Sequence, residues 1–315
     1  MKLNQVNDMG SSVCYFKSMK TIDPKELKPQ DLQAILQGAV APRPIAFAST
    51  IDQKGNVNLS PFSFFNLFSA NPPILVFSPS RRVRDNTTKH TLENVLEVPE
   101  VVIHIVGFDQ VEQMSLASTE YPKGVNEFQK AGLSAEKSDL VAPPRVKDSP
   151  VAFECRVNEV KSLGDQGGAG NLVICEILRI HLDERILDEK GNIDPHILSP
   201  VARLGGSWYS KITPDSLFQI PKPLTTLGIG VDQIPEEIRN SSVLTGNNLG
   251  RLGNVEQLPT QEEVEKLSQS SEVKKMRIRF KNDPDSWADH LHRWAKEELD
   301  AGNVDLAWKI LLQKQ

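Results

Sequence analysis

A short basic stretch, SRRVRDNTTKHT (residues 80–91), places three arginines and a lysine in a chain that is acidic overall. Side chains that could bind an anion follow the arginines, at Thr87, Thr88, Lys89 and Thr91. The apolar spacing after them predicts a helix over 88–97, and a helix N-terminus offers free N–H groups and partial positive charge. These groups together could bind one phosphate. A solvated basic loop would explain the same residues, so both interpretations stay open at this point.

The segment NLSPFSFFNLFSANPP (58–73) mixes phenylalanines with small polar side chains. The polar interruptions are Ser60, Ser63 and Asn66. Pro61 cannot donate in a sheet ladder, so backbone groups beside it are free to bond a ligand. Polar groups next to aromatic surfaces suit a flat heteroaromatic ligand. A barrel strand with core phenylalanines is the simpler interpretation, and we expect it for Phe62 and Phe68.

Other motifs for catalysis or metal binding find no support in the sequence. The three cysteines are scattered and no Cys/His spacing suggests zinc, so we predict neither a disulfide framework nor a metal site. The glycine clusters at 167–170 and 246–253 lack the strand-then-helix context of a nucleotide-binding motif. HExxH and GxSxG are absent, which removes support for a hydrolase.

The composition is that of a globular protein: of 315 residues, 39% are hydrophobic and 24% are charged. The net charge of −5 argues against a nucleic-acid-binding protein, which normally carries a basic surplus. The chain contains neither an apolar leader nor a run of about 18 apolar residues. We therefore expect a cytoplasmic protein that does not bind membranes.

The sequence pattern over residues 49–193 predicts mostly short strands joined by tight turns. We expect a short helix at 31–38, closed by Gly38, before them. The predicted strands lie at 44–51, 56–64, 74–78, 101–106, 151–160 and 171–182. In the fifth of these, strict alternation places Glu154 on the face opposite Val151, Phe153, Cys155 and Val157. So few helices favour an antiparallel barrel over a parallel sheet, which would need a crossover helix each time.

The C-terminal third has a different character. Gly/Pro/Asn-rich stretches after residue 214 predict an extended arm, and TQEE (260–263) fits a capping box that begins a short helix. Apolar residues at helical spacing over 285–299 and 304–312 predict a helical hairpin. The predicted organisation is an N-terminal arm (1–30), a barrel domain (31–215), and an arm plus helical hairpin of unknown role (216–315).

Four stretches of the chain, taken in their order, resemble the flavin reductase-like FMN-binding split-barrel family, closest to its flavoredoxin-like branch. They are GAVAPRPIAFASTIDQKGNVNLSPFSFFNLFSANPPILVFSP, RDNTTKHTLENV, SPVAFECRVNEV and RLGGSWY, within about residues 31–215. We therefore predict a mainly β protein: a six-stranded antiparallel split barrel with peripheral helices and a C-terminal helical extension. The resemblance also implies a homodimer that binds FMN non-covalently near the subunit interface.

The resemblance implies roles in FMN binding for three groups of residues. The isoalloxazine and ribityl chain would be lined by Ser63, Phe64, Phe65 and Asn66. The 5′-phosphate would be surrounded by Ser78, Arg81, Thr87, Thr88, Lys89 and Thr91. A wall near the flavin would be formed by Trp208 and Tyr209. We predict no catalytic residue, because a bound flavin transfers hydride or electrons itself.

The expected function is that of an FMN-dependent oxidoreductase of the flavin reductase or flavoredoxin type. The alternative is a non-enzymatic FMN-binding electron-transfer or flavin-carrier protein. Shorter NAD(P)H:flavin reductases of the family often carry a Gly-Asp-His motif associated with the nicotinamide. This chain has Gly164-Asp165-Gln166 instead. Whether NAD(P)H or a partner redox protein supplies the electrons therefore stays open.

Overall fold

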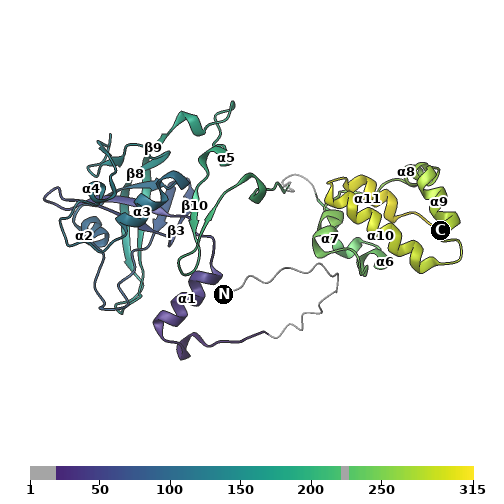
Figure 1. Ribbon diagram of the computed structural model, residues 1–315, viewed down its shortest axis with the longest axis horizontal. Helices are drawn as coiled ribbons and strands as arrows, with labels where there is room; N and C mark the ends of the chain where they lie inside the picture. The colour runs from purple at the N-terminus through teal and green to yellow at the C-terminus, as the bar shows by residue number, and fades with distance from the viewer. Residues whose placement is uncertain (1–18, 221–226) are drawn as a thin grey trace, which may run out of the picture. The chain divides into compact units, whose positions relative to one another are not determined.

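The computed structural model describes residues 19–220 and 227–315, and the chain divides into two compact units, 1–218 and 219–315 (Figure 1). We call them the barrel unit and the helical unit. Of the predicted N-terminal arm, residues 1–18 lie outside the described residues. Helix α1 (Pro29–Ala39) follows, and Gly38 lies inside it rather than closing it. The helix ends at Ala39 and does not continue to Ala41, because Ala41 precedes Pro42 and a residue before proline is disfavoured in helical conformation.

The barrel unit is built on a seven-stranded sheet in the order β2-β1-β5-β8-β9-β4-β3, and every neighbouring pair is antiparallel. The strands are β1 (Ala46–Ile51), β2 (Val57–Phe62), β3 (Phe65–Ala70), β4 (Pro73–Phe77), β5 (Glu100–Ile105), β8 (Val151–Ser162) and β9 (Asn171–Leu182). The prediction of six strands is one short. The segment 58–73 forms most of β2 and all of β3, because the chain turns after Phe62.

The turn between β2 and β3 shows how the sheet curves. These strands are the two edges of the sheet, yet only residues 63 and 64 separate them in the chain. The edges must therefore approach each other, as in the antiparallel barrel that the sequence predicts. The N–H of Ser78, just after β4, donates to the carbonyl of Phe64 at 2.8 Å. This bond fixes the turn beside the connection that leads from β4 to α2.

Two apolar clusters stabilise the barrel unit from opposite faces of β1. Ala46 and Ala48 face a cluster with Phe77, Cys155 and Cys175, which α2 (His90–Glu97) covers through Leu92 and Val95. Ile45 and Phe47 face a second cluster under α3 (Val111–Ala117) and α4 (Glu127–Ala131). Successive strand side chains point to opposite faces, so burial on both sides requires the continuous apolar run seen at 45–48.

Smaller elements complete the barrel unit. They are a 3₁₀ helix at Pro24–Glu26, β6 (Ala135–Glu136), β7 (Arg145–Val146), α5 (Pro195–Leu198), β10 (Val201–Arg203) and β11 (Tyr209–Lys211). The helices among the described residues are too short or too polar to cross a bilayer.

The helical unit differs from the predicted arm and hairpin. Its described residues form α6 (Glu236–Arg239), α7 (Gly246–Gly253), α8 (Gln261–Ser268), α9 (Ser271–Arg279), α10 (Pro284–Asp300) and α11 (Val304–Leu311). The predicted hairpin corresponds to α10 and α11, and the capping box at Thr260 and Glu263 is present. The stretch GNNLGRLG is helix α7, not irregular chain, because Thr245 and Asn248 cap its N-terminus reciprocally.

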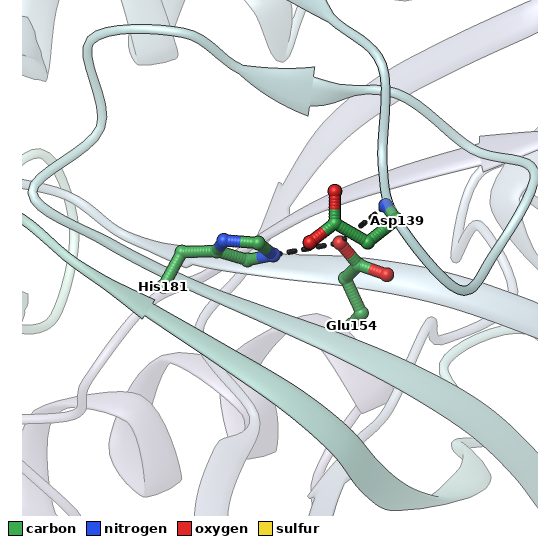
Figure 2. Close-up of side chains that lie close together, drawn as sticks. All are labelled: Asp139, Glu154 and His181. Atoms are coloured by element: carbon green, nitrogen blue, oxygen red, sulfur yellow. Dashed lines mark hydrogen bonds and ion pairs between the residues drawn. The ribbon is translucent and has the colours of Figure 1, made fainter.

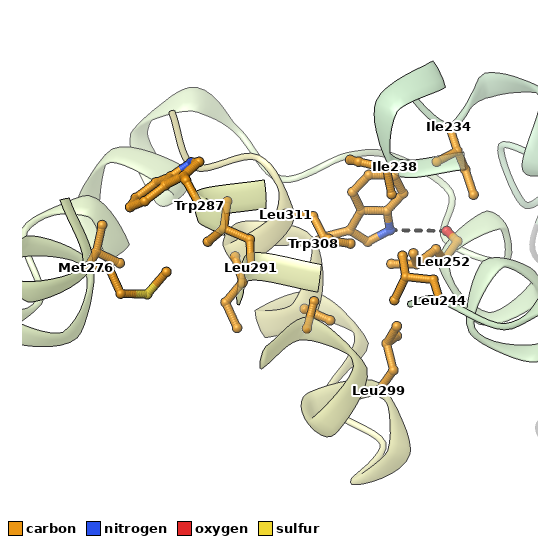
Figure 3. Packing of buried hydrophobic residues seen from close by; sticks show 14 residues of the cluster. Ile234, Ile238, Leu244, Leu252, Met276, Trp287, Leu291, Leu299, Trp308 and Leu311 are labelled. Carbon is orange, nitrogen blue, oxygen red and sulfur yellow. Dashed lines mark hydrogen bonds between the residues drawn. The ribbon is translucent and has the colours of Figure 1, made fainter. Parts of the chain in front are cut away.

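A core of its own holds the helical unit together (Figure 3). Trp287 and Leu291 of α10 and Trp308 of α11 are buried in it, and the Trp308 indole N–H donates to the carbonyl of Leu252 at 3.1 Å. Glycines in this unit permit close approach of the backbone: a Cβ at Gly228 would lie 2.6 Å from the carbonyl oxygen of Gly253. Gly228 and Gly253, two of the glycines that suggested an arm, therefore serve packing.

Candidate functional site

A cavity of about 390 Å³ opens where the two edges of the curved sheet meet. Its walls come from α1, from the end of β2 and the β2–β3 turn, from the connection between β4 and α2 (residues 78–89, the basic loop), and from the residues that directly follow α3. The predicted site residues that line it are Ser63, Phe64, Ser78, Arg81 and Lys89. The remaining predicted residues lie elsewhere or point away from it, as described below.

The β2–β3 turn offers the flat, partly polar surface expected for a heteroaromatic ligand. Ser63 and Phe64 occupy the turn itself, and the Phe64 ring is partly exposed. Phe65 and Asn66 are already in β3, where they pair with Phe77 and Val76 of β4. The Asn66 side chain accepts a hydrogen bond from the N–H of Leu67 at 2.8 Å. The turn therefore brings Ser63 and Phe64 into the cavity and leaves Phe65 and Asn66 outside the residues that line it.

Behind this turn lies Arg43, a residue that the sequence analysis missed. Its guanidinium is buried and donates to the carbonyls of Gln37 at 2.6 Å and Leu204 at 3.0 Å, and also to that of Val40. It lies 5.9 Å from the centroid of the Phe64 ring. Burial lowers the pKa of Arg43, and the nearby Arg203 lowers it further. The only available signal was the PRP triplet inside the segment that carries the family resemblance.

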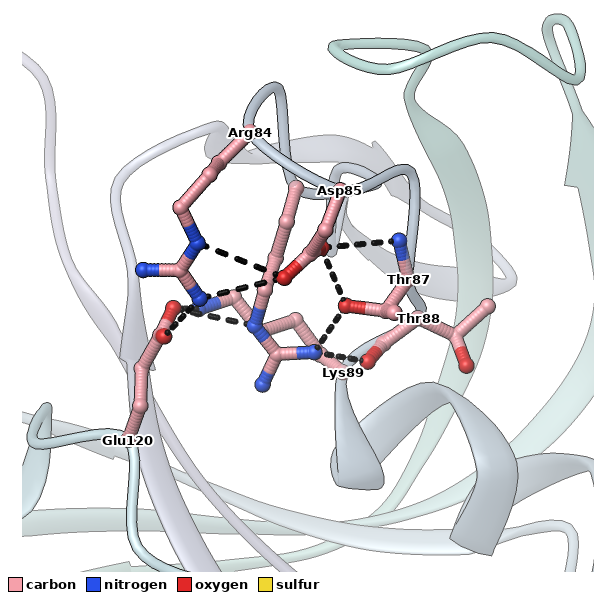
Figure 4. Close-up of polar contacts among 7 residues, drawn as sticks. Arg84, Asp85, Thr87, Thr88, Lys89 and Glu120 are labelled. Atoms are coloured by element: carbon pink, nitrogen blue, oxygen red, sulfur yellow. Dashed lines mark hydrogen bonds and ion pairs between the residues drawn. The ribbon is translucent and has the colours of Figure 1, made fainter.

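Three cations of the basic loop converge on one carboxylate, Glu120, which follows α3 (Figure 4). Glu120 Oε1 lies 2.9 Å from Arg82 Nε and 3.4 Å from Lys89 Nζ, and Oε2 lies 3.1 Å from Arg84 Nη2. The hydrogen bond from Arg82 is the largest cause that lowers the pKa of Glu120 to about 2. The sequence predicted a phosphate site in this loop with Lys89 and Arg81 as its cations and left Arg82 and Arg84 out. The structure instead groups Arg82 and Arg84 with Lys89, around an acidic partner that sequence reasoning did not identify.

Arg81 faces away from this cluster. Its Nε donates to the side-chain oxygen of Asn86 at 2.7 Å, and its Nη2 donates to the Asn86 carbonyl at 2.7 Å. Asn86 has a φ of 58°, in the left-handed region that asparagine tolerates better than most residues. Arg81 therefore lines the cavity while it holds the basic loop in shape.

The three threonines do not point toward a common centre. The Thr87 hydroxyl donates to Asp85 at 2.6 Å, and that of Thr88 donates to Glu93 at 2.7 Å. Thr91 is buried in α2, and its hydroxyl donates to the side chain of Asn58 at 2.6 Å. We therefore leave Thr91 out of the phosphate site, since its hydroxyl serves to attach α2 to β2.

Two serines at the start of the basic loop complete the cavity wall. The Ser78 hydroxyl accepts a hydrogen bond from the N–H of Asn171 at 3.1 Å. A Cβ at Gly170 would lie 2.7 Å from that hydroxyl oxygen, so any larger residue would displace the Ser78 side chain. The hydroxyl of Ser80 is buried and has no hydrogen-bond partner among the described residues. Such an unsatisfied buried group fits a ligand that supplies acceptors, as a phosphate does.

The loop that contains Gly164-Asp165-Gln166 supports the basic loop from behind. The Asn86 side chain donates to the Asp165 carbonyl at 2.9 Å, and the N–H of Arg81 donates to the Ala169 carbonyl at 2.8 Å. A Cβ at Gly167 would lie 3.0 Å from the carbonyl oxygen of Val83. In this chain the segment thus has a visible role in positioning the cations.

Trp208 and Tyr209 do not line the cavity of this chain. Trp208 is 76% exposed, and Tyr209 lies in β11 with the Arg203 guanidinium 4.4 Å from its ring centroid. Arg43 links this segment to the cavity through its bond to Leu204. Within one chain, Trp208 and Tyr209 therefore do not form the wall near the flavin that the resemblance implies.

Asp139, Glu154 and His181 form a further cluster, with ligand-type atoms within 4.8 Å of one another (Figure 2). Glu154 is fully buried, although strand alternation placed it outward, because residues 138–142 cover that face. Its carboxylate accepts from the N–H of Asp139 at 2.9 Å and pairs with His181 at 2.7 Å. Burial raises the pKa of Glu154. Hydrogen bonds from the backbone N–H groups of Asp139 and Leu140 lower that pKa by more, so the net shift is downward. These bonds account for the cluster as a structural anchor.

Comparisons with known proteins agree with the barrel unit. The family model described as flavin reductase like domain matches residues 39–197. An uncharacterized protein of Aquifex aeolicus is 40% identical over 187 residues, which cover 59% of this chain and 93% of that protein. An uncharacterized protein of Halalkalibacterium halodurans is 35% identical over 192 residues, which cover 60% of this chain and 91% of the relative. The helical unit lies outside the residues that the family model matches.

Three solved structures resemble the barrel unit. Nitrilotriacetate monooxygenase component B from Bacillus cereus superposes with a TM-score of 0.60 at 30% identity, over 64% of this chain and 99% of that one. The 2-nitrobenzoate 2-nitroreductase of Pseudomonas fluorescens superposes with a TM-score of 0.58 at 26% identity, over 66% of this chain and 100% of the other. A putative flavin reductase with a split barrel domain, from Shewanella frigidimarina, gives 0.54 at 26% identity over 63% and 96% of the two chains.

Proposed function

The chain belongs to the flavin reductase-like domain family, and from this premise we propose that it is an FMN-dependent oxidoreductase of the flavin reductase or flavoredoxin type. One observation carries the proposal: a single cavity joins the Ser63–Phe64 turn to the basic loop. A flat ring system at the turn and a phosphate at the loop are the two ends of FMN. The bound flavin would supply the hydride or electron transfer.

Different residues of this chain would bind the phosphate and the ring system of FMN. Arg82, Arg84 and Lys89 present positive charge for the phosphate, and the unsatisfied Ser80 hydroxyl can donate to a phosphate oxygen. Backbone groups of the turn at Ser63 and Phe64 would hold the edge of the ring. Arg43 lies behind that turn, and its charge would favour negative charge on the ring system.

We also propose that the active form is a homodimer. Leu178, Ile180 and Leu182 of β9 are exposed and alternate along one face of the strand. Exposed apolar stripes of this kind commonly mark a protein interface. The partner's copy of Trp208 and Tyr209 could then form the wall that one chain does not build for itself. Sedimentation at micromolar concentration should give twice the chain mass, and a monomer that still binds FMN tightly would contradict this part of the proposal.

The second candidate is a non-enzymatic FMN carrier or electron-transfer protein. The observation that favours it is Gly164-Asp165-Gln166 in place of the family's Gly-Asp-His. The likeness to a 2-nitrobenzoate 2-nitroreductase supports the enzyme instead. The electron donor, NAD(P)H or a partner redox protein, decides between the two.

Two measurements test the proposal in order. FMN titration, followed by quenching of flavin fluorescence, should show saturable binding, and a flat titration would refute the flavin site. Anaerobic mixing of the FMN complex with NADH or NADPH should then bleach the visible absorbance of the flavin, because the nucleotide transfers hydride to it. Binding without bleaching by either nucleotide would favour the carrier.

A further inference from the structure

The carboxylate of Glu120 occupies the centre of the cation cluster that the cavity offers to an anion. Arg82, Arg84 and Lys89 come from the basic loop, whereas Glu120 comes from the segment after α3, 31 to 38 residues later in the chain. Both the acid and its three partners line the same cavity (Figure 4). A carboxylate and a phosphate accept the same charge-assisted bonds from arginine and lysine. Glu120 thus contacts the groups that a ligand phosphate would need.

The exposure of these side chains shows that the arrangement can open. The Glu120 side chain is 43% exposed and that of Arg84 is 75% exposed, whereas those of Lys89 and Arg82 are 31% and 15% exposed. Ion pairs in such surroundings contribute little to stability, because water and salt screen them. The carboxylate can therefore turn toward solvent by rotation about its own side-chain bonds. The buried pair of Glu154 and His181 in the same unit has no comparable freedom.

The local charge balance favours exchange of one anion for another. Three cations face two carboxylates, those of Glu120 and Asp85, so one positive charge remains. A phosphate monoester carries close to two negative charges at neutral pH and has three acceptor oxygens. It can therefore bond all three cations when Glu120 leaves, whereas both anions together would leave an excess of negative charge.

We propose that Glu120 is an internal competitor for the phosphate of the ligand. Its carboxylate holds Arg82, Arg84 and Lys89 when no phosphate is bound, and it withdraws when one binds. The protein consequently binds a phosphorylated flavin more weakly, and releases it faster, than its cations alone would allow. This inference rests on the proposed function and deepens it, because it assigns to one residue a faster exchange of the flavin and a limit on the preference for FMN over riboflavin.

The experiment compares the full-length wild type with E120Q and with E112Q. Glu112 is an exposed acid of α3 that does not line the cavity, so E112Q matches the change in net charge. Each protein is titrated with FMN and with riboflavin at one fixed ionic strength. We expect E120Q to lower the dissociation constant of FMN about 10-fold, since the competing charge-assisted bonds are gone. Riboflavin, which lacks the phosphate, should change less than about 2-fold by the same reasoning.

A second measurement does not depend on flavin binding. Inorganic phosphate at millimolar concentration should raise the melting temperature of E120Q more than that of the wild type or E112Q. If E120Q binds FMN more weakly than the wild type does, Glu120 orients the cations and the inference is overturned. Equal tightening for riboflavin, or equal phosphate stabilisation in all three proteins, overturns it too. Wild type that binds no flavin refutes the proposed function, and the phosphate measurement still decides the role of Glu120.

Discussion

The barrel unit and the helical unit differ in what they bury. The buried acidic, arginine and histidine side chains among the described residues all belong to the barrel unit; they are Arg43, Asp52, His104, Glu127 and Glu154. The buried polar side chains of the helical unit are neutral, namely Asn248, Ser268 and Gln313. Burial of charge costs free energy unless hydrogen bonds compensate for it. The barrel unit accepts that cost at several separate places, whereas the helical unit is stabilised mainly by apolar packing.

This comparison predicts that the two units respond separately to mutation, and the largest effect should come from the helical core. Trp308→Ala removes a buried indole and its bond to Leu252, which should cost about 3–5 kcal/mol of unfolding free energy. FMN affinity should persist, because the cavity residues belong to the barrel unit. Calorimetry and FMN titration measure the two quantities. Ile278→Ala, at an exposed position of α9, is the control. Loss of FMN binding in W308A would contradict the prediction that the two units respond separately.

The next effect belongs to the barrel unit and depends on pH. His104 is fully buried; its Nε2 accepts from the N–H of Val146 at 2.9 Å and its Nδ1 lies 2.8 Å from the Phe47 carbonyl, so the ring is neutral. Burial is the main cause that lowers the pKa of His104 to about 4.

The sign of the effect follows from proton uptake on unfolding. The unfolded histidine has a pKa near 6.5 and binds a proton first, so stability falls as the pH drops from about 6.5 to about 4, by roughly 3 kcal/mol. Denaturant unfolding across this range measures it. H104Q should show a shallower pH dependence than H196Q, whose histidine is exposed, and identical slopes would contradict the assignment.

The basic loop should show a smaller effect, confined to the ligand. Arg82→Ala removes a charge-assisted bond, so FMN should bind about 10-fold more weakly while riboflavin changes little. Arg156→Ala is a matched control, since Arg156 pairs with Glu176 on the sheet and does not line the cavity. Equal losses for FMN and riboflavin would place the phosphate elsewhere.

The smallest effect separates a structural threonine from a binding one. Thr91→Val leaves the side chain of Asn58 without its hydroxyl partner and should cost about 1 kcal/mol of stability. FMN affinity should stay within error of the wild type, because the hydroxyl points into the protein. Chemical denaturation and FMN titration of the same sample test both statements. A clear loss of FMN affinity at full stability would return Thr91 to the phosphate site.

Much of the barrel unit follows from local patterns in the sequence. The strands at 101–106, 151–160 and 171–182 were predicted close to their observed bounds, because alternation and apolar runs are signals that each strand carries by itself. The seventh strand was missed because an apolar run does not reveal where the chain turns within it. Helix α7 was missed for a related reason: glycines read as breakers, yet they allow the chain to pack closely around Gly253.

The site divides in the same way. Residue types near one another in the chain identified the basic loop and the mixed polar and aromatic segment 58–73, and the order of motifs identified the family; the turn at Ser63 and Phe64 was not predicted. The partners of those residues come from distant segments: Glu120 lies 38 residues from Arg82, and Leu204 lies 161 residues from Arg43. Local patterns cannot specify such pairs, because only the curvature of the sheet brings the segments together. The sequence by itself thus determined which chemical groups are available, and the tertiary structure decided which of them meet.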